Sequence, residues 1–346
     1  MIKKLMKHKI QTTIAGSLPK PNWIADTGKL WSPWKLSGEA LEFGKLNATL
    51  LSVGDQLQAG ISIITDGEQS RQHFVTTFIE NLSGVNFKKR KVVRIRDRYD
   101  ASVPTVVARI ERKKAVFLKY VEFLRKLTTK KIKFSLPGPM TMVDTLYDNY
   151  YKNREKLAWR FAEVLNDEAK ELEKAGVDYI QFDEPAFNVF FDDVKNWGVS
   201  ALERAAKGLK VKTAVHICYG YGIKANNDWK KTLGQEWRQY EKIFPLLNQS
   251  KINQISLECM NSKVPLELLS LLDKKEVLAG VIDVANKKTE TPKQVFELIK
   301  KIIKYVKPKK LTCCTNCGMI TLPNQIANKK MAAMVKGAEL AEKYLF

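Results

Sequence analysis

Short apolar runs alternate with longer amphipathic segments along most of the chain. Apolar runs of this length, bounded by polar residues, glycine or proline, are typical of buried strands. We place strands at residues 11–18, 61–65, 132–136, 177–182, 211–217, 252–257, 277–284 and 311–315. Apolar residues at helical spacing lie between them, most clearly in residues 38–59, 114–127, 152–175 and 324–344. Eight strands that alternate with helices predict the α/β fold class, as a single-domain (β/α)8 TIM barrel.

One segment departs from this alternation and favours a hairpin inserted into the barrel. Lys88–Lys91 is an unbroken basic run, and the bulky residues that follow it alternate with Arg94, Arg96 and Arg98. A period of two is that of an extended strand, so this hairpin is expected to have one basic face. The domain prediction is therefore one barrel over residues 1–346, with a basic hairpin insertion at about 86–110.

The composition excludes several classes of protein. Hydrophobic residues make up 45% and charged residues 28% of the 346 residues, which is ordinary for a globular protein. No apolar run approaches the roughly 20 residues of a membrane-spanning helix, so no membrane association is expected. The N-terminal MIKKLMKHKIQTT is basic but lacks the apolar segment of about 7–15 residues found in secretory signals. Five cysteines at irregular spacing do not indicate a disulfide framework, and a cytoplasmic protein is expected.

Polar and metal-binding residue types follow directly after most of the predicted strands. In a (β/α)8 barrel the C-terminal ends of the strands meet at one mouth, where active sites are built. The residues expected to meet there are Ser17, Glu68, Asp183, His216, Cys218, Glu258, Asp283 and Cys317.

His216 and Cys218 are the start of a candidate metal site. They are two positions apart, so on an extended strand their side chains project from one face and can converge on one cation. Glu258 and Cys317 would complete a tetrahedron of nitrogen, sulfur and oxygen ligands. Ligands drawn from distant segments favour a catalytic zinc over a structural one.

The cysteines also have simpler interpretations. A buried cysteine is commonly a small apolar residue, and Cys314-x-x-Cys317 alone is typical of a redox pair. The chain has only three histidines and five cysteines, and their concentration after two predicted strands favours the metal site. Cys259 and Cys313 are expected to be core residues.

The strand-end motifs resemble the catalytic half of cobalamin-independent methionine synthase. The resemblance covers essentially the whole chain and is carried by Ile14–Pro19, Asp66-Gly67-Glu68, Gln181–Pro185, His216-x-Cys218, Glu258 and Asn316-Cys317-Gly318. Full-length members have a second, N-terminal barrel without a counterpart here. The chain is therefore most similar to the short stand-alone core form, of the MesB type.

This resemblance implies a methyltransferase that makes methionine from homocysteine with the help of Zn²⁺. The implied zinc ligands are His216, Cys218, Glu258 and Cys317. The residues implied to bind the amino-acid end of homocysteine are Ser17, Glu68 and Asp183, and the two given a catalytic role are Glu258 and Asp183. A free thiol has a pKa near 8.5 and only its thiolate is a good nucleophile, so zinc would keep the substrate sulfur reactive.

The methyl donor stays open at this point. Full-length enzymes have a tryptophan in the segment that matches Pro137–Asp144, where the folate ring binds, and this chain has none there. The donor is expected to be 5-methyltetrahydrofolate or a methyl group carried by a partner protein. The alternative within the same class is another zinc-dependent thiol methyltransferase, which uses S-methylmethionine or a corrinoid-bound methyl group.

The net charge of +22 provides an alternative from another class. A basic protein with a structural zinc could bind RNA or another polyanion through the face from Lys88 to Arg98. No helix-turn-helix, zinc-finger pair or RNA-binding signature accompanies this charge, so nucleic acid is not an expected partner.

Overall fold

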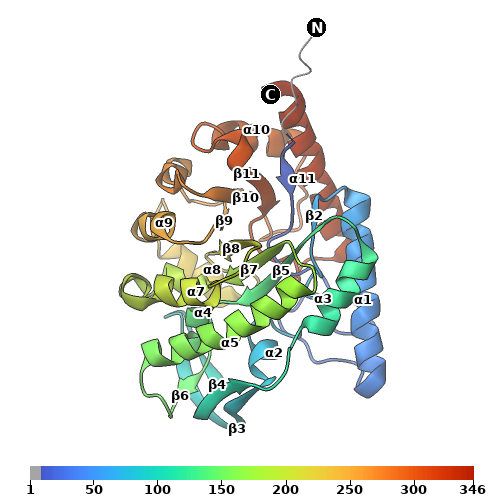
Figure 1. Ribbon diagram of the computed structural model, residues 1–346. Helices are drawn as coiled ribbons and strands as arrows, with labels where there is room; N and C mark the ends of the chain where they lie inside the picture. Colours follow the sequence, from blue (N-terminus) through green and yellow to red (C-terminus); the bar gives the residue numbers. More distant parts are fainter. Residues whose placement is uncertain (1–8) are drawn as a thin grey trace.

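Eight parallel strands form a barrel that helices surround in the computed structural model, which describes residues 9–346 (Figure 1). Their order around the barrel is β1 (Gln11–Thr12), β11 (Leu311–Thr315), β10 (Glu276–Ile282), β9 (Gln254–Glu258), β8 (Lys212–His216), β7 (Tyr179–Asp183), β5 (Lys131–Pro137) and β2 (Ile63–Ile64). β1 and β2, the first and last strands of this order, meet where the amide of Ser62 donates to the carbonyl of Thr12 at 3.2 Å. This closure confirms the predicted TIM barrel.

Helices cover the outside of the barrel. They are α1 (Gly38–Ala59), α2 (Thr76–Ile79), α3 (Leu118–Leu127), α4 (Pro139–Asp144), α5 (Arg154–Lys174), α6 (Phe191–Asp193), α7 (Val199–Ala205), α8 (Lys224–Lys231), α9 (Tyr240–Gln249), α10 (Pro292–Ile302) and α11 (Asn324–Leu345). Local sequence sets their ends: Thr291 and Gln294 form a capping box at the start of α10, and α1 ends at Gly60, whose φ is 85°. Within the described residues, no helix has the length and apolar character needed to cross a membrane.

The first eight residues lie outside the described part of the chain. The N-terminal segment on which the cytoplasmic expectation partly rests begins there.

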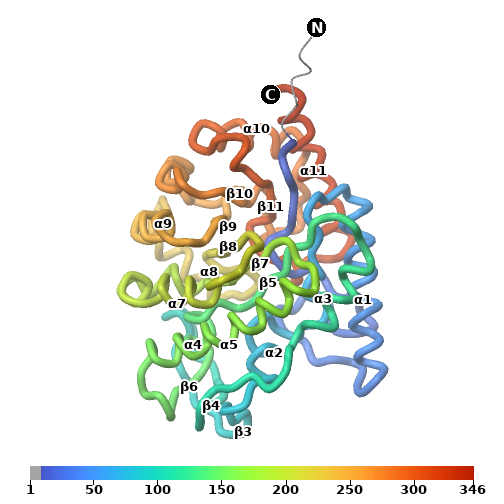
Figure 2. The backbone as a smooth tube through the Cα atoms, in the orientation of Figure 1, coloured from blue at the N-terminus to red at the C-terminus, as the bar shows by residue number. Residues whose placement is uncertain are grey.

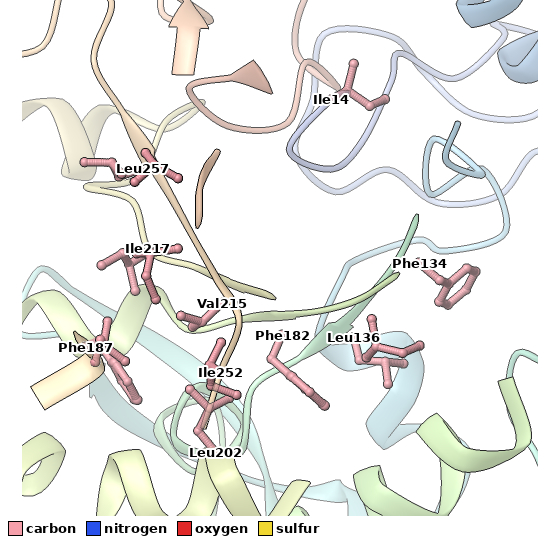
Figure 3. Close-up of a cluster of buried hydrophobic side chains, with 14 of the residues drawn as sticks. Ile14, Phe134, Leu136, Phe182, Phe187, Leu202, Val215, Ile217, Ile252 and Leu257 are labelled. Carbon is pink, nitrogen blue, oxygen red and sulfur yellow. The ribbon is translucent and has the colours of Figure 1, made fainter. Parts of the chain in front are cut away.

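The core lies between the strands and the helices. Val215, Phe182 and Leu136 come from neighbouring strands and are fully buried beside one another (Figure 3). Burying each such side chain stabilises the fold by about 1.5–3 kcal/mol, and Phe182→Ala is expected to cost about 3–5 kcal/mol. Successive residues of a strand face opposite sides of the sheet. Because Phe182 packs against the helices, its neighbours Gln181 and Asp183 face the inside of the barrel.

A second, three-stranded sheet holds the inserted hairpin. It consists of β3 (Leu82–Ile95), β4 (Tyr99–Arg112) and the short β6 (Tyr147–Asp148). Figure 2 shows these three strands together at one end of the molecule, beyond α4 and α5. The hairpin thus extends a few residues beyond both predicted boundaries.

The predicted basic face of the hairpin is wrong at its tip. Lys88–Lys91 and Arg94 are exposed, but Arg96 and Arg98 are buried. The strand alternation ends at Ile95, because Arg96 and Asp97 adopt left-handed backbone conformations with φ of 46° and 52° and form the turn. The tip therefore points two guanidinium groups inward, away from the basic surface.

Candidate active site

Three of the predicted metal ligands lie together at the mouth of the barrel. His216 is the last residue of β8, Cys218 follows two positions later, and Cys317 lies two positions beyond β11. Their ligand atoms all lie within 4.8 Å of one another, and the two sulfur atoms are 3.6 Å apart. β8 and β11 are separated in the sheet by β9 and β10, so barrel closure is what brings these residues together.

The orientation of His216 supports a cation between the three side chains. Its Nδ1 lies 2.9 Å from the hydroxyl of Ser256, whereas its Nε2 is buried and has no hydrogen-bond partner within residues 9–346. Buried polar atoms are nearly always paired, and metal-binding histidines commonly use the other ring nitrogen to hold a neighbouring polar group. The unpaired Nε2 therefore fits a metal ligand.

The pKa shifts within the cluster also support a metal site. A hydrogen bond with the Cys317 thiol, assisted by His216, holds the pKa of Cys218 well below its usual value. Burial disfavours the charged imidazole, yet the neighbouring Cys218 raises the pKa of His216 overall. Thiolate and imidazole are ligands that zinc accepts together.

Glu258, the fourth predicted ligand, is not part of this cluster of ligand atoms. Its Oε1 accepts a hydrogen bond from the amide of Tyr219 at 2.9 Å, and its Oε2 accepts one from the hydroxyl of Tyr240 at 2.7 Å. Burial and the nearby Cys218 raise the pKa of Glu258 to about 7. Two protein donors thus hold this carboxylate at the end of β9.

The three residues predicted to bind an amino acid line the same pocket as the cluster. Glu68 follows β2 in a strained loop, with φ of 56°, and accepts a hydrogen bond from the hydroxyl of Ser135 at 3.1 Å. Ser17 lies against Gly318, where an added Cβ would come within 2.3 Å of the serine oxygen. Only glycine allows this approach, which explains the glycine directly after Cys317.

Asp183 is held from below by a buried network. Lys133 donates to Oε1 of Gln181 at 2.6 Å, and Nε2 of Gln181 donates to Asp183 at 2.8 Å. Burial, together with Glu68 and against the effect of His216, raises the pKa of Asp183 to about 7. Two carboxyl groups that share a buried pocket in this way would be stabilised by a bound ammonium group.

Sequence reasoning missed the cationic rim of the pocket. Residues that add to its lining are Lys20, His73, Arg96, Arg98 and Tyr221. The sequence carried one unused signal, because Asp97 between two arginines is a turn residue that marks a hairpin tip.

Arg98 is the best-fixed member of this rim. Its Nη1 donates to the carbonyl of Tyr219 at 3.0 Å and to Oδ1 of Asn226 at 3.1 Å, and its guanidinium lies 3.6 Å from the ring centre of Trp229. Its Nε and Nη2, although buried, have no partner in the described part of the chain. Arg98 can therefore still donate hydrogen bonds to a ligand.

The remaining cysteines and Asp283 have other surroundings. Cys259, Cys313 and Cys314 are buried, and Cys314 donates to the carbonyl of Leu278 at 3.3 Å. Cys317 is therefore near Cys218 and not paired with Cys314, which disfavours the redox interpretation. Asp283 accepts hydrogen bonds from its own loop, including one from the amide of Ala285 at 2.7 Å.

Comparisons with known proteins agree with these motifs. The family described as the catalytic domain of cobalamin-independent synthase matches residues 10–340. A methionine synthase of Saccharolobus solfataricus is 34% identical, covering 97% of this chain and 96% of that protein. A methionine synthase of Sulfolobus acidocaldarius is 33% identical, with 97% and 93% coverage.

Solved structures give the same result. A B12-independent methionine synthase from Shewanella sp. W3-18-1, in complex with selenomethionine, superposes with a TM-score of 0.95. It is 62% identical, and the match covers 97% of this chain and 99% of that one. A protein from Listeria monocytogenes, with a TM-score of 0.70 and 17% identity, shares the fold.

Proposed function

The chain belongs to the cobalamin-independent methionine synthase family, and from this we propose that it methylates the sulfur of homocysteine at a zinc site. Family membership makes it a methyltransferase of the cobalamin-independent type and argues against a non-catalytic polyanion-binding protein. The observation that carries the proposal is a single pocket with the His216, Cys218 and Cys317 cluster beside the carboxyl groups of Glu68 and Asp183.

The three clustered side chains would hold the zinc, and Glu258 is proposed as an oxygen ligand beside them. The unpaired Nε2 of His216 and the soft sulfur ligands fit this metal. Zinc supplies positive charge that keeps a bound substrate thiol ionised near neutral pH. Ser256 would keep the imidazole of His216 turned toward the metal.

The chain's own residues would orient homocysteine in the pocket. Glu68 and Asp183 would accept hydrogen bonds from its ammonium group, and the Ser17 hydroxyl would donate to its carboxylate. Gln181 and Lys133 would fix Asp183 from beneath. The Shewanella relative was solved with selenomethionine, a product-like amino acid, and a comparable position here would direct the substrate sulfur to the cluster.

The methyl donor is proposed to enter past the cationic rim. 5-Methyltetrahydrofolate and a methyl-carrying partner protein are both candidates, since Arg96 and Arg98 can attract anionic groups of either. The segment Pro139–Asp144 forms the buried α4 and offers no tryptophan for a folate ring. S-Methylmethionine or a corrinoid-bound methyl group is the second candidate, favoured by that same absence.

Methionine formation tests this proposal directly. Purified protein would be given homocysteine with each donor in turn, first alone and then with cell extract. Methionine that appears with one donor, and disappears in Cys317→Ser, is the expected result. No methionine with any donor, with or without extract, would contradict it.

A further inference from the structure

α1 has an outer face that is mostly apolar, on a strongly cationic protein. This helix lies at the edge of the molecule, beside α3 and α11 (Figure 1). Its inner side is buried, whereas Phe43, Leu50 and Leu51 are 67%, 47% and 53% exposed. Between Ala40 and Leu57, the exposed positions of α1 carry no charge, and the acidic Glu42 and Asp55 are half-buried at the two edges of this face. The net charge of the chain, in contrast, is +22.

The exposed residues form one continuous stripe. Its members are Ala40, Phe43, Leu50, Leu51, Gly54 and Leu57, with the half-buried Asn47 between them. Spacings of three and four residues keep them on one side of a helix, over a length of about 25 Å. The buried side of α1 is no more apolar than this stripe, because Thr49, Ser52 and Gln56 are among its six residues. A contiguous apolar surface of this kind usually marks an interaction site.

The stripe is complementary to itself when reversed. If two copies of α1 pack antiparallel about a two-fold axis between residues 48 and 49, Phe43 of one copy faces Gly54 of the other. Ala40 then faces Leu57, and Asn47 faces Leu50. At the first two of these pairs a large residue meets a small one, and the two-fold axis repeats each contact in the opposite direction. Around Gly54 there is open space, with no atom within 4 Å of an added Cβ, so this position can receive a phenyl ring.

Charge also favours a second copy over other partners. An acidic partner would be attracted to the lysine-rich surfaces and would gain nothing at a neutral helix. A second cationic copy is repelled by most of the surface and can approach closely only where charge is absent.

We propose that α1 is the dimer interface of this protein, with Phe43 of each copy packed over Gly54 of the other. The two cationic copies repel each other, so added salt should strengthen the dimer by screening this repulsion. Salt would instead weaken a complex with an acidic partner.

Sedimentation velocity over a wide range of concentration tests the interface. Wild-type protein is expected to sediment as a dimer, and Leu50→Glu as a monomer with unchanged zinc content. Val92→Glu is the matched control, since Val92 is 71% exposed on the hairpin, and it should remain dimeric. A monomeric wild type at every concentration, or a dimer that Leu50→Glu leaves intact, would overturn the proposal.

A volume exchange tests the register without relying on a disruptive charge. Gly54→Leu should fold at least as well as wild type, because leucine favours helix and the site is open in the single chain. It should nevertheless raise the dimer dissociation constant roughly tenfold or more by filling the space for Phe43. Phe43→Ala with Gly54→Leu exchanges large for small and should restore most of the affinity. A double variant no better than Gly54→Leu alone would reject the antiparallel pairing.

Discussion

The floor and the rim of the pocket are built in different ways. The floor residues His216, Asp183 and Glu258 are the last residues of strands β8, β7 and β9, so the hydrogen-bonded ladder fixes their backbones. The rim residues Arg96 and Arg98 come from a hairpin tip whose turn needs left-handed backbone conformations. We infer that the floor performs the chemistry shared by the family, and that the rim adapts it to a methyl donor.

The floor and the rim also differ in their charged residues. The floor concentrates thiols, an imidazole and carboxyl groups, which together suit a metal ion and an ammonium group. The rim places Lys20, Arg96 and Arg98 around the entrance, and burial lowers the pKa of Lys20 to about 8. Homocysteine held on the floor and an anionic methyl donor attracted to the rim would meet between the two regions.

The largest expected effect is loss of the metal from the floor. Cys317→Ser should remove most zinc and activity, because it takes one of the two clustered sulfurs. Cys314→Ser is the matched control, three residues earlier and outside the cluster, and should retain zinc, as should Cys259→Ser and Cys313→Ser. Zinc per chain, measured by mass spectrometry of the purified proteins, decides this. Equal loss in all four variants would refute the division between ligands and core cysteines.

Asp183→Asn should weaken homocysteine binding without changing zinc content. Removing a charged acceptor of the substrate ammonium group costs about 1.5–3 kcal/mol, or roughly 10- to 150-fold in affinity. Asp283→Asn, directly after β10 and bonded to Ala285 and Asn261, should bind normally. Calorimetric titration with homocysteine measures both, and unchanged affinity in Asp183→Asn would remove this residue from the site.

A smaller effect is expected at the rim, and it should fall on the donor alone. Arg98→Gln should raise the apparent KM for the donor or the requirement for a partner several-fold. Arg94→Gln should do so less, because Arg94 is exposed and partly paired with Asp100 at 3.4 Å. Neutralising Arg94, Arg96 and Arg98 together should give the largest rim effect, again with normal zinc. If Arg94→Gln equals Arg98→Gln, the surface charge and not the pocket attracts the donor.

His73 should give the smallest effect, on stability in acid. Burial, with Arg96 and Lys20 nearby, lowers its pKa from 6.5 to about 4. The unfolded chain therefore takes up a proton first as the pH falls, and stability decreases between about pH 6.5 and 4. His73→Asn should reduce this decrease by about 1–2 kcal/mol, since the ring is only half-buried. Urea unfolding at several pH values measures the difference, and parallel curves for both proteins would exclude His73 as the cause.

The contrast between the floor and the rim also explains which parts of the structure could be predicted from the sequence. The predicted bounds of the helix at 38–59 and the strand at 311–315 equal the observed ones. Both predictions rest on local signals, namely helical spacing and a short apolar run. Local alternation also placed His216, Cys218 and Cys317 at strand ends, and the barrel rule then brought them together. The inward turn of Arg96 and Arg98 depends on contacts with Asp144 and Tyr219, which lie far away in sequence. Periodicity cannot report such contacts.

The most direct test of the central claim is X-ray absorption at the zinc edge, with and without homocysteine. The account predicts about one zinc per chain, with two sulfur ligands in the free protein and three once homocysteine is bound. Protein without zinc, or a sulfur count that homocysteine leaves unchanged, would contradict it.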